Sequence, residues 1–528
     1  MYLSPFGFSI FWGRVGGILL ISATYGLAAS IIKRLFSCNT WLIYISCLVS
    51  LLAFPYWSLD FMIHYYNFPF FLLVLFFFSF LVALERDGLE AKLFIFLTGV
   101  IALAIPFARV SLCWIPAVPL VYLMLPPIHE WRTHNKALFF YIAGCIVSGS
   151  LFYFAYTVWS RQYVFFPGIP VTLMERIRDF KHYFLIMIPV IFQSCGCVVL
   201  IVYLRCVKKI PLLVKSFLLL VFIAILGSFM YYYANKYSGG TGFGITVYWV
   251  DIIVHAPFIL MFYQIFTQSK SHAELPVSPK IAVPAFNLFI LMLCSTACLY
   301  PFGTNLGLIK ISYTLPLIGP LLILILILNS GWSKDLIRTV LFFLCLSGMG
   351  MILFMSVFDV PRYRCSTSFD IECAKGILTS PRRADYADSV VSELKKITKK
   401  NEEVMCILVL KYMFFTMSER RAWNHEEWQF RHDKLFDRFE WTWKRKKLPR
   451  VAIVDENALT PYRTWGKEIL SRFYDKKYSY NFANSEFIVL PQPKKDLVIS
   501  IWTRNDHPET ESEKEALLRS IREKYAYK

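Results

Sequence analysis

The chain has 528 residues, of which 57% are hydrophobic and 17% are charged, and its formal net charge at pH 7 is +19. So apolar a composition excludes a large soluble protein and indicates a polytopic membrane protein with a soluble part. The basic excess favours anionic lipid headgroups or phosphorylated substrates as partners, whereas no motif indicates nucleic-acid binding.

Apolar segments follow one another from Ile10 to Phe358. They predict about 11 membrane spans, since each crossing needs about 20 residues. The first three run over about 10–32, 40–61 and 68–83. Residues 92–126 are too long for one span and contain Pro106 and Arg109, so we expect two segments with a break there. The later spans are expected at about 138–158, 183–204, 211–234, 247–267, 281–301, 315–330 and 337–358.

Basic residues cluster in alternate connections between these segments. Short loops rich in Lys and Arg stay cytoplasmic, so the alternation predicts the topology. It places the N-terminus and the C-terminal tail on the outer side of the membrane. The clusters are Lys33–Arg34, Arg86 and Lys92, Arg132 and Lys136, Arg205 with Lys208 and Lys209, Lys270 and Lys280, and Lys334 with Arg338.

Three predicted outer loops differ from the short connections between the spans. Residues 160–182 are long and charged, and their second half has the spacing of an amphipathic helix lying in the membrane interface. Residues 235–246 contain Lys236 and a glycine-rich run that either wraps a phosphate with backbone amides or is a flexible loop. A third outer segment covers residues 300–307.

The composition changes after Phe358. The pattern predicts helices near 384–398, 426–446 and 465–474, strands at 404–410 and 451–455, and a strand pair over 478–489 with a turn at 480–484. Alternating strands and helices indicate a small α/β domain. We therefore expect a transmembrane helical domain over 1–358 and an extracytoplasmic α/β domain over 359–528. In it, Cys365 and Cys373 either form a disulfide or remain two thiols.

Ionisable residues in or near membrane spans are costly and are candidates for function. Asp251 and His255 lie four apart, on one helical face, and form either a catalytic or proton-handling pair or a structural pair. Asp60 lies at the first outer loop, four residues before His64, and is either a general base, a ligand of a divalent metal ion or a solvated loop end. These three are weak catalytic candidates, and no metal-binding spacing occurs.

Basic residues on the predicted outer side are candidates for holding the phosphate of a lipid-linked substrate. The alternative for each is an ordinary contact with a lipid headgroup. The candidates are Arg109, Arg161, Arg176, Arg178 and Lys236.

The layout, with Pro301-Phe-Gly-Thr-Asn305 before Leu315-Pro316-Leu317 and the region Leu93–Pro116 with Arg109, resembles the bacterial GT-C type integral-membrane glycosyltransferases. The resemblance implies transfer of a sugar from a polyprenyl-phosphate donor to a lipid or glycan of the cell envelope, as in lipopolysaccharide assembly. It also implies an inner-membrane location, an activating carboxylate, basic residues on the donor phosphate and, in some members, a divalent metal ion.

This chain departs from the family at its start. Members begin with a cytoplasmic N-terminus, one span and a large outer loop that bears the catalytic acid, whereas this sequence enters what corresponds to the second span almost at once. We therefore expect an N-terminally incomplete or inactive member, and no catalytic carboxylate is carried over. The alternatives are an envelope glycan polymerase or ligase, a transporter, and a non-catalytic membrane protein.

Overall fold

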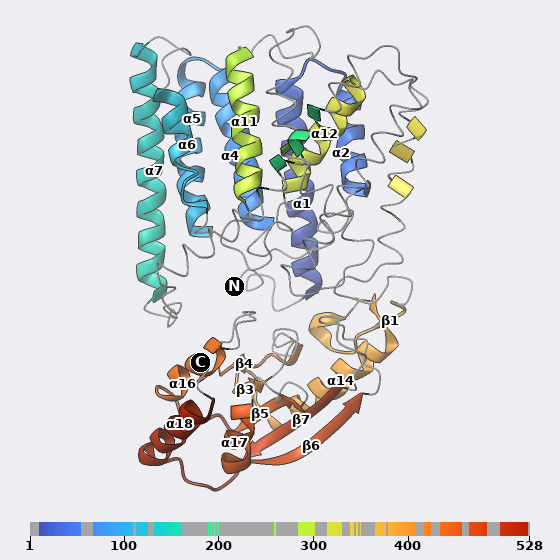
Figure 1. Ribbon diagram of the computed structural model, residues 1–528, viewed down its shortest axis with the longest axis vertical. Helices are drawn as coiled ribbons and strands as arrows, with labels where there is room; N and C mark the ends of the chain where they lie inside the picture. Colours follow the sequence, from blue (N-terminus) through green and yellow to red (C-terminus); the bar gives the residue numbers. More distant parts are fainter. Residues whose placement is uncertain are drawn as a thin grey trace. The chain divides into compact units, whose positions relative to one another are not determined.

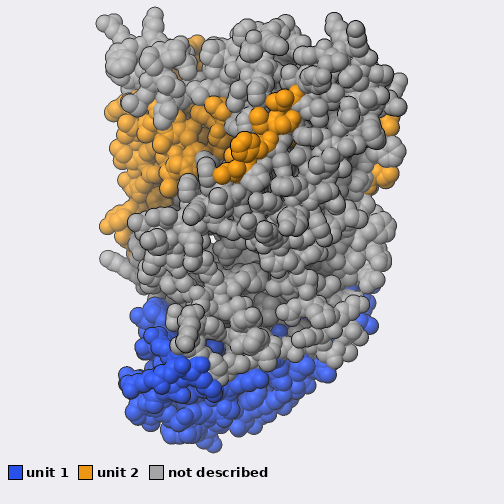
Figure 2. All heavy atoms as spheres, in the orientation of Figure 1, with its two compact units in different colours: residues 1–13, 353–528 blue, residues 14–352 orange. Residues whose placement is uncertain are grey.

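The computed structural model describes twelve longer segments and a few isolated residues. The segments are 10–53, 67–108, 112–124, 131–160, 283–300, 314–329, 365–375, 378–407, 417–423, 433–456, 464–482 and 497–525. The chain divides into two compact units, coloured separately in Figure 2. We call Arg14–Ile352 the helical unit, and Leu353–Lys528 with Met1–Gly13 the α/β unit.

The helical unit consists, in its described part, of apolar helices of different lengths (Figure 1). Four of them are long and apolar enough to cross a membrane, over Val15–Leu35, Phe68–Glu85, Gly88–Ala108 and Lys136–Ala155. The total of about 11 spans and their orientation stay predictions. The helices are α1 (Ile10–Leu35), α2 (Thr40–Ala53), α4 (Asn67–Glu85), α5 (Gly88–Ala108), α6 (Ala117–Met124), α7 (Trp131–Ser160), α11 (Val283–Leu299) and α12 (Leu315–Asn329).

Contacts between these helices fix their relative directions. Arg34 at the end of α1 forms an ion pair with Glu85 at the end of α4, so these two ends lie together. Helices α4 and α11 are antiparallel, because Phe77 packs against Phe289 and Phe70 against Tyr300. Both relations agree with the alternation expected from the basic loops.

The predicted break within residues 92–126 is confirmed. Helix α5 ends at Ala108, and a turn over 112–116 leads into the short helix α6. Tyr141 of α7 donates a hydrogen bond of 2.7 Å to the carbonyl oxygen of Pro116 in this turn. A buried phenol thus finds a partner in an irregular segment, as apolar surroundings require.

The α/β unit contains a mixed sheet of five strands in the order β4-β3-β5-β7-β6. Strand β3 (Glu403–Ile407) is parallel to β4 (Arg421–Ala422) and to β5 (Val451–Asp455). Strand β7 (Leu497–Arg504) is antiparallel to β5 and to the edge strand β6 (Tyr474–Phe482). A separate two-stranded sheet pairs β1 (Thr367–Ser368) with β2 (Leu378–Thr379).

Helices cover both faces of the five-stranded sheet. Alternate residues of β5 separate its faces, so Val451 and Ile453 pack with α14 (Pro381–Ile397). Ala452 and Val454 face the opposite layer, where Trp443 and Trp465 are fully buried. That layer comprises α16 (Asp433–Trp443), α17 (Thr464–Phe473) and α18 (Glu511–Tyr525).

Most of the elements expected after Phe358 are present at nearly the predicted positions, but the predicted turn is wrong. The strand expected to turn at 480–484 continues as β6 through Phe482, where Asn481 still pairs with Val498 of β7. Phe482 packs edge-to-face on Tyr386 of α14 at 4.5 Å, which favours the extended strand over the turn. The side chain of Cys373 lies outside the described residues, so the disulfide with Cys365 stays a prediction.

We expect the α/β unit to lose stability in acid through Glu419. The hydrogen bond from Lys400 holds the pKa of Glu419 below its usual 4.5. A lowered folded-state pKa gives stability that is present above the unfolded pKa and is lost as the pH falls through the folded one. The free energy of unfolding in urea is measured at pH 6.5 and at pH 3.5. Glu419→Gln should reduce the difference between these two free energies by up to about 1 kcal/mol. Lys400→Gln should reduce this difference in the same way. If neither substitution changes it, the Lys400–Glu419 ion pair does not stabilise the folded unit.

Candidate functional site

Every residue that the sequence suggests for catalysis or binding lies outside the described part of the chain. The catalytic candidates concerned are Asp60, Asp251 and His255, and the substrate-binding candidates are Arg109, Arg161, Arg176, Arg178 and Lys236. Their roles therefore stay predictions. What the structure does describe is the pair of helices, α5 and α7, that directly precede two of these arginines in the chain.

Helices α5 and α7 pack with their backbones in close contact (Figure 1). A Cβ atom added at Gly99 of α5 would lie 2.2 Å from the carbonyl oxygen of Tyr141. One added at Gly144 of α7 would lie 2.1 Å from the carbonyl oxygen of Phe96. The Cys145 thiol also hydrogen-bonds the Gly99 carbonyl oxygen at 3.4 Å. Small residues permit such close approach in membrane helices, where packing drives association.

The two helices run in the same direction. Gly99 lies against Tyr141 and Cys145, and four residues further along α5 Leu103 lies against Gly149. Positions therefore advance together on both helices. Their carboxyl ends thus lie at the same end of the pair, and the chain must return between them through the segment that contains α6.

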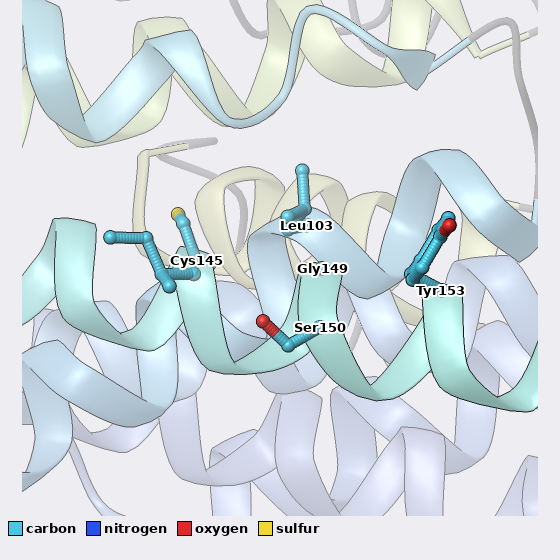
Figure 3. A pocket seen from close by; sticks show the side chains of 6 residues that line it. Leu103, Cys145, Gly149, Ser150 and Tyr153 are labelled. Carbon is cyan, nitrogen blue, oxygen red and sulfur yellow. The ribbon is translucent and has the colours of Figure 1, made fainter.

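A hollow of about 510 Å³ lies along this pair, towards its carboxyl end. Leu103 comes from α5, and the other lining residues lie along α7 (Figure 3). Ile146 and Tyr153 are 63% and 72% exposed, so the hollow opens onto the surface of the helical unit. The lining residues are Leu103, Cys145, Ile146, Gly149, Ser150 and Tyr153. An apolar hollow on a membrane helix pair suits an isoprenoid or acyl chain.

Aromatic stacking holds the carboxyl end of the pair together. The rings of Phe107 on α5 and Phe152 on α7 stack at 4.3 Å with an interplanar angle of 8°. Helix α5 ends about 8 Å beyond Leu103, and α7 about 10 Å beyond Tyr153, at 1.5 Å per residue. Arg109 and Arg161 are the next residues in sequence after these two ends.

Two roles are open for a basic residue at such a position. It can bind a phosphate at the end of the hollow, or it can interact with the partial negative charge at the helix carboxyl end. The second role is purely structural and is worth at most about 1 kcal/mol at an exposed site. A binding measurement on arginine variants separates the two.

The described part of the α/β unit offers less for catalysis. Tyr386 of α14 and Asp455 at the end of β5 are both buried. Burial, together with the charge of Asp455, raises the pKa of Tyr386 well above its usual value, so the phenol stays protonated. Among the described residues, no group of three or more His, Cys, Asp or Glu side chains is placed to hold a metal ion. The divalent metal therefore stays a prediction.

Sequence reasoning missed the hollow and the close contact between α5 and α7 at Gly99 and Gly144. The signal is Gly99 together with Gly144 and Gly149, small residues within otherwise bulky apolar helices. Glycine is common in membrane helices, so the pattern alone does not tell which helices meet.

Comparison with known proteins leaves the family open. No protein-family model matches the chain, and no curated protein matches it. The solved structures that show similarity include two of ArnT from Cupriavidus metallidurans. The form bound to undecaprenyl phosphate has a TM-score of 0.44 at 11% identity, over 94% of this chain and 85% of that one. The apo form has a TM-score of 0.36 at 10% identity, over 92% and 83%. At these values neither likeness establishes the fold or the activity of this chain.

Proposed function

We propose that this chain is a membrane glycosyltransferase that moves a sugar from a polyprenyl-phosphate donor to a lipid or glycan of the cell envelope. The observation that carries the proposal is the apolar hollow on α5 and α7, near the carboxyl ends that Arg109 and Arg161 directly follow in sequence. A long isoprenoid chain would lie along the hollow. Its phosphate would then reach the membrane surface near the two arginines.

The chemistry requires one bond to form and one to break. An acceptor hydroxyl oxygen attacks the anomeric carbon of the sugar, and the bond from that carbon to the phosphate oxygen breaks. A carboxylate takes the hydroxyl proton, for which Asp60 and Asp251 are candidates, with His255 as a further proton acceptor. Arginine guanidinium groups stabilise the negative charge on the departing polyprenyl phosphate.

Arginine variants give a specific expectation for donor binding. Arg109→Gln and Arg161→Gln should each weaken binding of a fluorescent polyprenyl phosphate to the purified full chain about tenfold, since each removes a charged hydrogen-bond donor. Arg86→Gln, which removes a charge from the Glu90 ion pair beside the amino end of α5, serves as the matched control. If both variants bind the polyprenyl phosphate as the wild type does, the two arginines do not bind the phosphate and serve only to stabilise the carboxyl ends of the helices.

Transfer itself is tested in membranes that contain the full chain. A panel of radiolabelled polyprenyl-phosphate sugars is supplied, and label is followed into lipid and glycan fractions. Label in a new fraction only when the chain is present supports the proposal. Movement of the intact donor across the membrane without transfer would indicate a transporter, and elongation of existing glycan from lipid-linked repeats would indicate a polymerase or ligase.

A further inference from the structure

Two lysines lie at the amino ends of α5 and α7, and one of them stands over an aromatic ring of the other helix. The Lys92 ammonium of α5 lies 5.9 Å from the ring centroid of Phe140 on α7. Lys136 precedes Phe140 by four residues on α7 and therefore lies one turn away on the same side of that helix. Because the two helices are parallel, with Gly99 beside Tyr141 and Cys145, Lys92 and Lys136 stand at matching levels.

Two arginines near this end of the helices are neutralised by ion pairs. Arg34 pairs with Glu85, and Arg86 pairs with Glu90 at 3.1 Å. Within the segments that the structure describes, neither Lys92 nor Lys136 forms an ion pair. The two lysines, at matching levels of the parallel helices, give a local positive charge at the edge of an apolar surface.

Exposed apolar side chains lie next to the lysines. Leu93 of α5 is 55% exposed and Phe139 of α7 is 67% exposed. Both helices qualify as membrane-spanning by length and composition, and Lys136 begins the apolar stretch of α7. This surface therefore presents ammonium groups at the helix ends and apolar side chains further along the helices. A phospholipid, with an anionic phosphate and acyl chains, complements both.

We propose that Lys92 and Lys136 bind the headgroup phosphate of one anionic phospholipid, whose acyl chains lie over Leu93 and Phe139. Basic positions between membrane helices on the cytoplasmic side bind anionic headgroups in this way, and the basic loops predict that this end is cytoplasmic. Lys92 lies 11 residues, or about 16 Å, from Leu103 along α5. The site is thus distinct from the hollow and does not depend on the proposed transferase activity.

Native mass spectrometry of the delipidated full chain in detergent tests this site. Phosphatidylglycerol, phosphatidylcholine and inorganic phosphate are titrated as separate probes. The double variant Lys92→Gln with Lys136→Gln should raise the dissociation constant for phosphatidylglycerol about tenfold or more. Each lysine near a membrane surface contributes about 1 kcal/mol to the binding of anionic lipid. Lys33→Gln, which removes a basic charge at the end of α1, should leave it unchanged. Lys92→Arg with Lys136→Arg should retain binding.

Thermal unfolding of each variant shows whether the fold is intact, and the arginine pair provides a second test if the glutamine pair is unstable. The proposal is overturned if the glutamine pair binds phosphatidylglycerol as the wild type does, or if the arginine pair loses binding while folded. Equal affinity for phosphatidylcholine would show a site for acyl chains alone. Displacement of phosphatidylglycerol by an equal concentration of inorganic phosphate would show a free-anion site. Either of these results also rejects the assignment.

Discussion

Replacing Gly99 with alanine should destabilise the helical unit by about 3 kcal/mol, the upper end of the usual cost of overpacking. The new methyl group would lie 2.2 Å from the Tyr141 carbonyl oxygen and 3.1 Å from the Cys145 backbone nitrogen. Both are backbone atoms of α7, so no side chain can rotate away and the helices must separate. Gly144→Ala should act alike, because its methyl group meets the backbone of α5 at Phe96. The measurement is unfolding of the purified chain in mixed micelles with increasing SDS.

Gly26→Ala is the matched control, since it adds the same methyl group to an apolar helix where no atom beyond the chain neighbours and the helix's own backbone lies within 4 Å. Gly149→Ala is intermediate, because its methyl group meets only the tip of the Leu103 side chain, at 3.2 Å. We expect Gly99 and Gly144 variants to unfold first, the Gly149 variant next, and the Gly26 variant with the wild type. If Gly99→Ala and Gly26→Ala unfold together, the α5–α7 contact is not as close as described.

Replacing Glu509 with glutamine should destabilise the α/β unit by about 3 kcal/mol. The carboxylate is 5% exposed and accepts from Trp443 Nε1 at 2.7 Å, from the Leu448 backbone N–H and from Arg504 Nη2 at 2.6 Å. Glutamine keeps the shape but turns one oxygen into a donor that faces other donors. It also leaves Arg504 without its countercharge, which is costly for a largely buried pair. Tryptophan fluorescence during urea unfolding measures the loss.

Glu403→Gln provides the control for Glu509. Glu403 pairs with Lys446 on the surface, where the two side chains are 39% and 41% exposed. Removal of such a pair costs at most about 1 kcal/mol, because water already solvates both charges. Equal destabilisation by the two substitutions would show that Glu509 is not the buried connection between α16 and β7.

The elements of this chain could largely be predicted from local pattern. Val451–Val454 is a continuous apolar run, and β5 covers it together with Asp455, as predicted. Helix α5 ends at Ala108, two residues after Pro106, whose missing N–H removes one hydrogen bond from the last turn of the helix. Lysine and arginine in the short loops gave relative helix directions that the Arg34–Glu85 ion pair supports.

Which elements meet could not be predicted in the same way. The contact of Gly99 with Tyr141 joins residues on two helices that are apolar on every side, so no amphipathic face indicates the partner. Phe482 at the end of β6 packs against Tyr386 of α14, a contact between residues nearly a hundred positions apart in sequence. The hollow follows from such contacts, and hence the candidate site was not visible in the sequence.

The most direct test of the proposed function is photo-crosslinking with a polyprenyl phosphate that carries a diazirine in its first isoprene units. The full chain in membranes is irradiated, digested and analysed by mass spectrometry. We predict labels on α5 near Leu103 and on α7 between Cys145 and Tyr153, competed by unlabelled polyprenyl phosphate and not by phosphatidylglycerol. Labels confined to other parts of the chain, or labels that polyprenyl phosphate fails to compete, would contradict a donor site in this hollow.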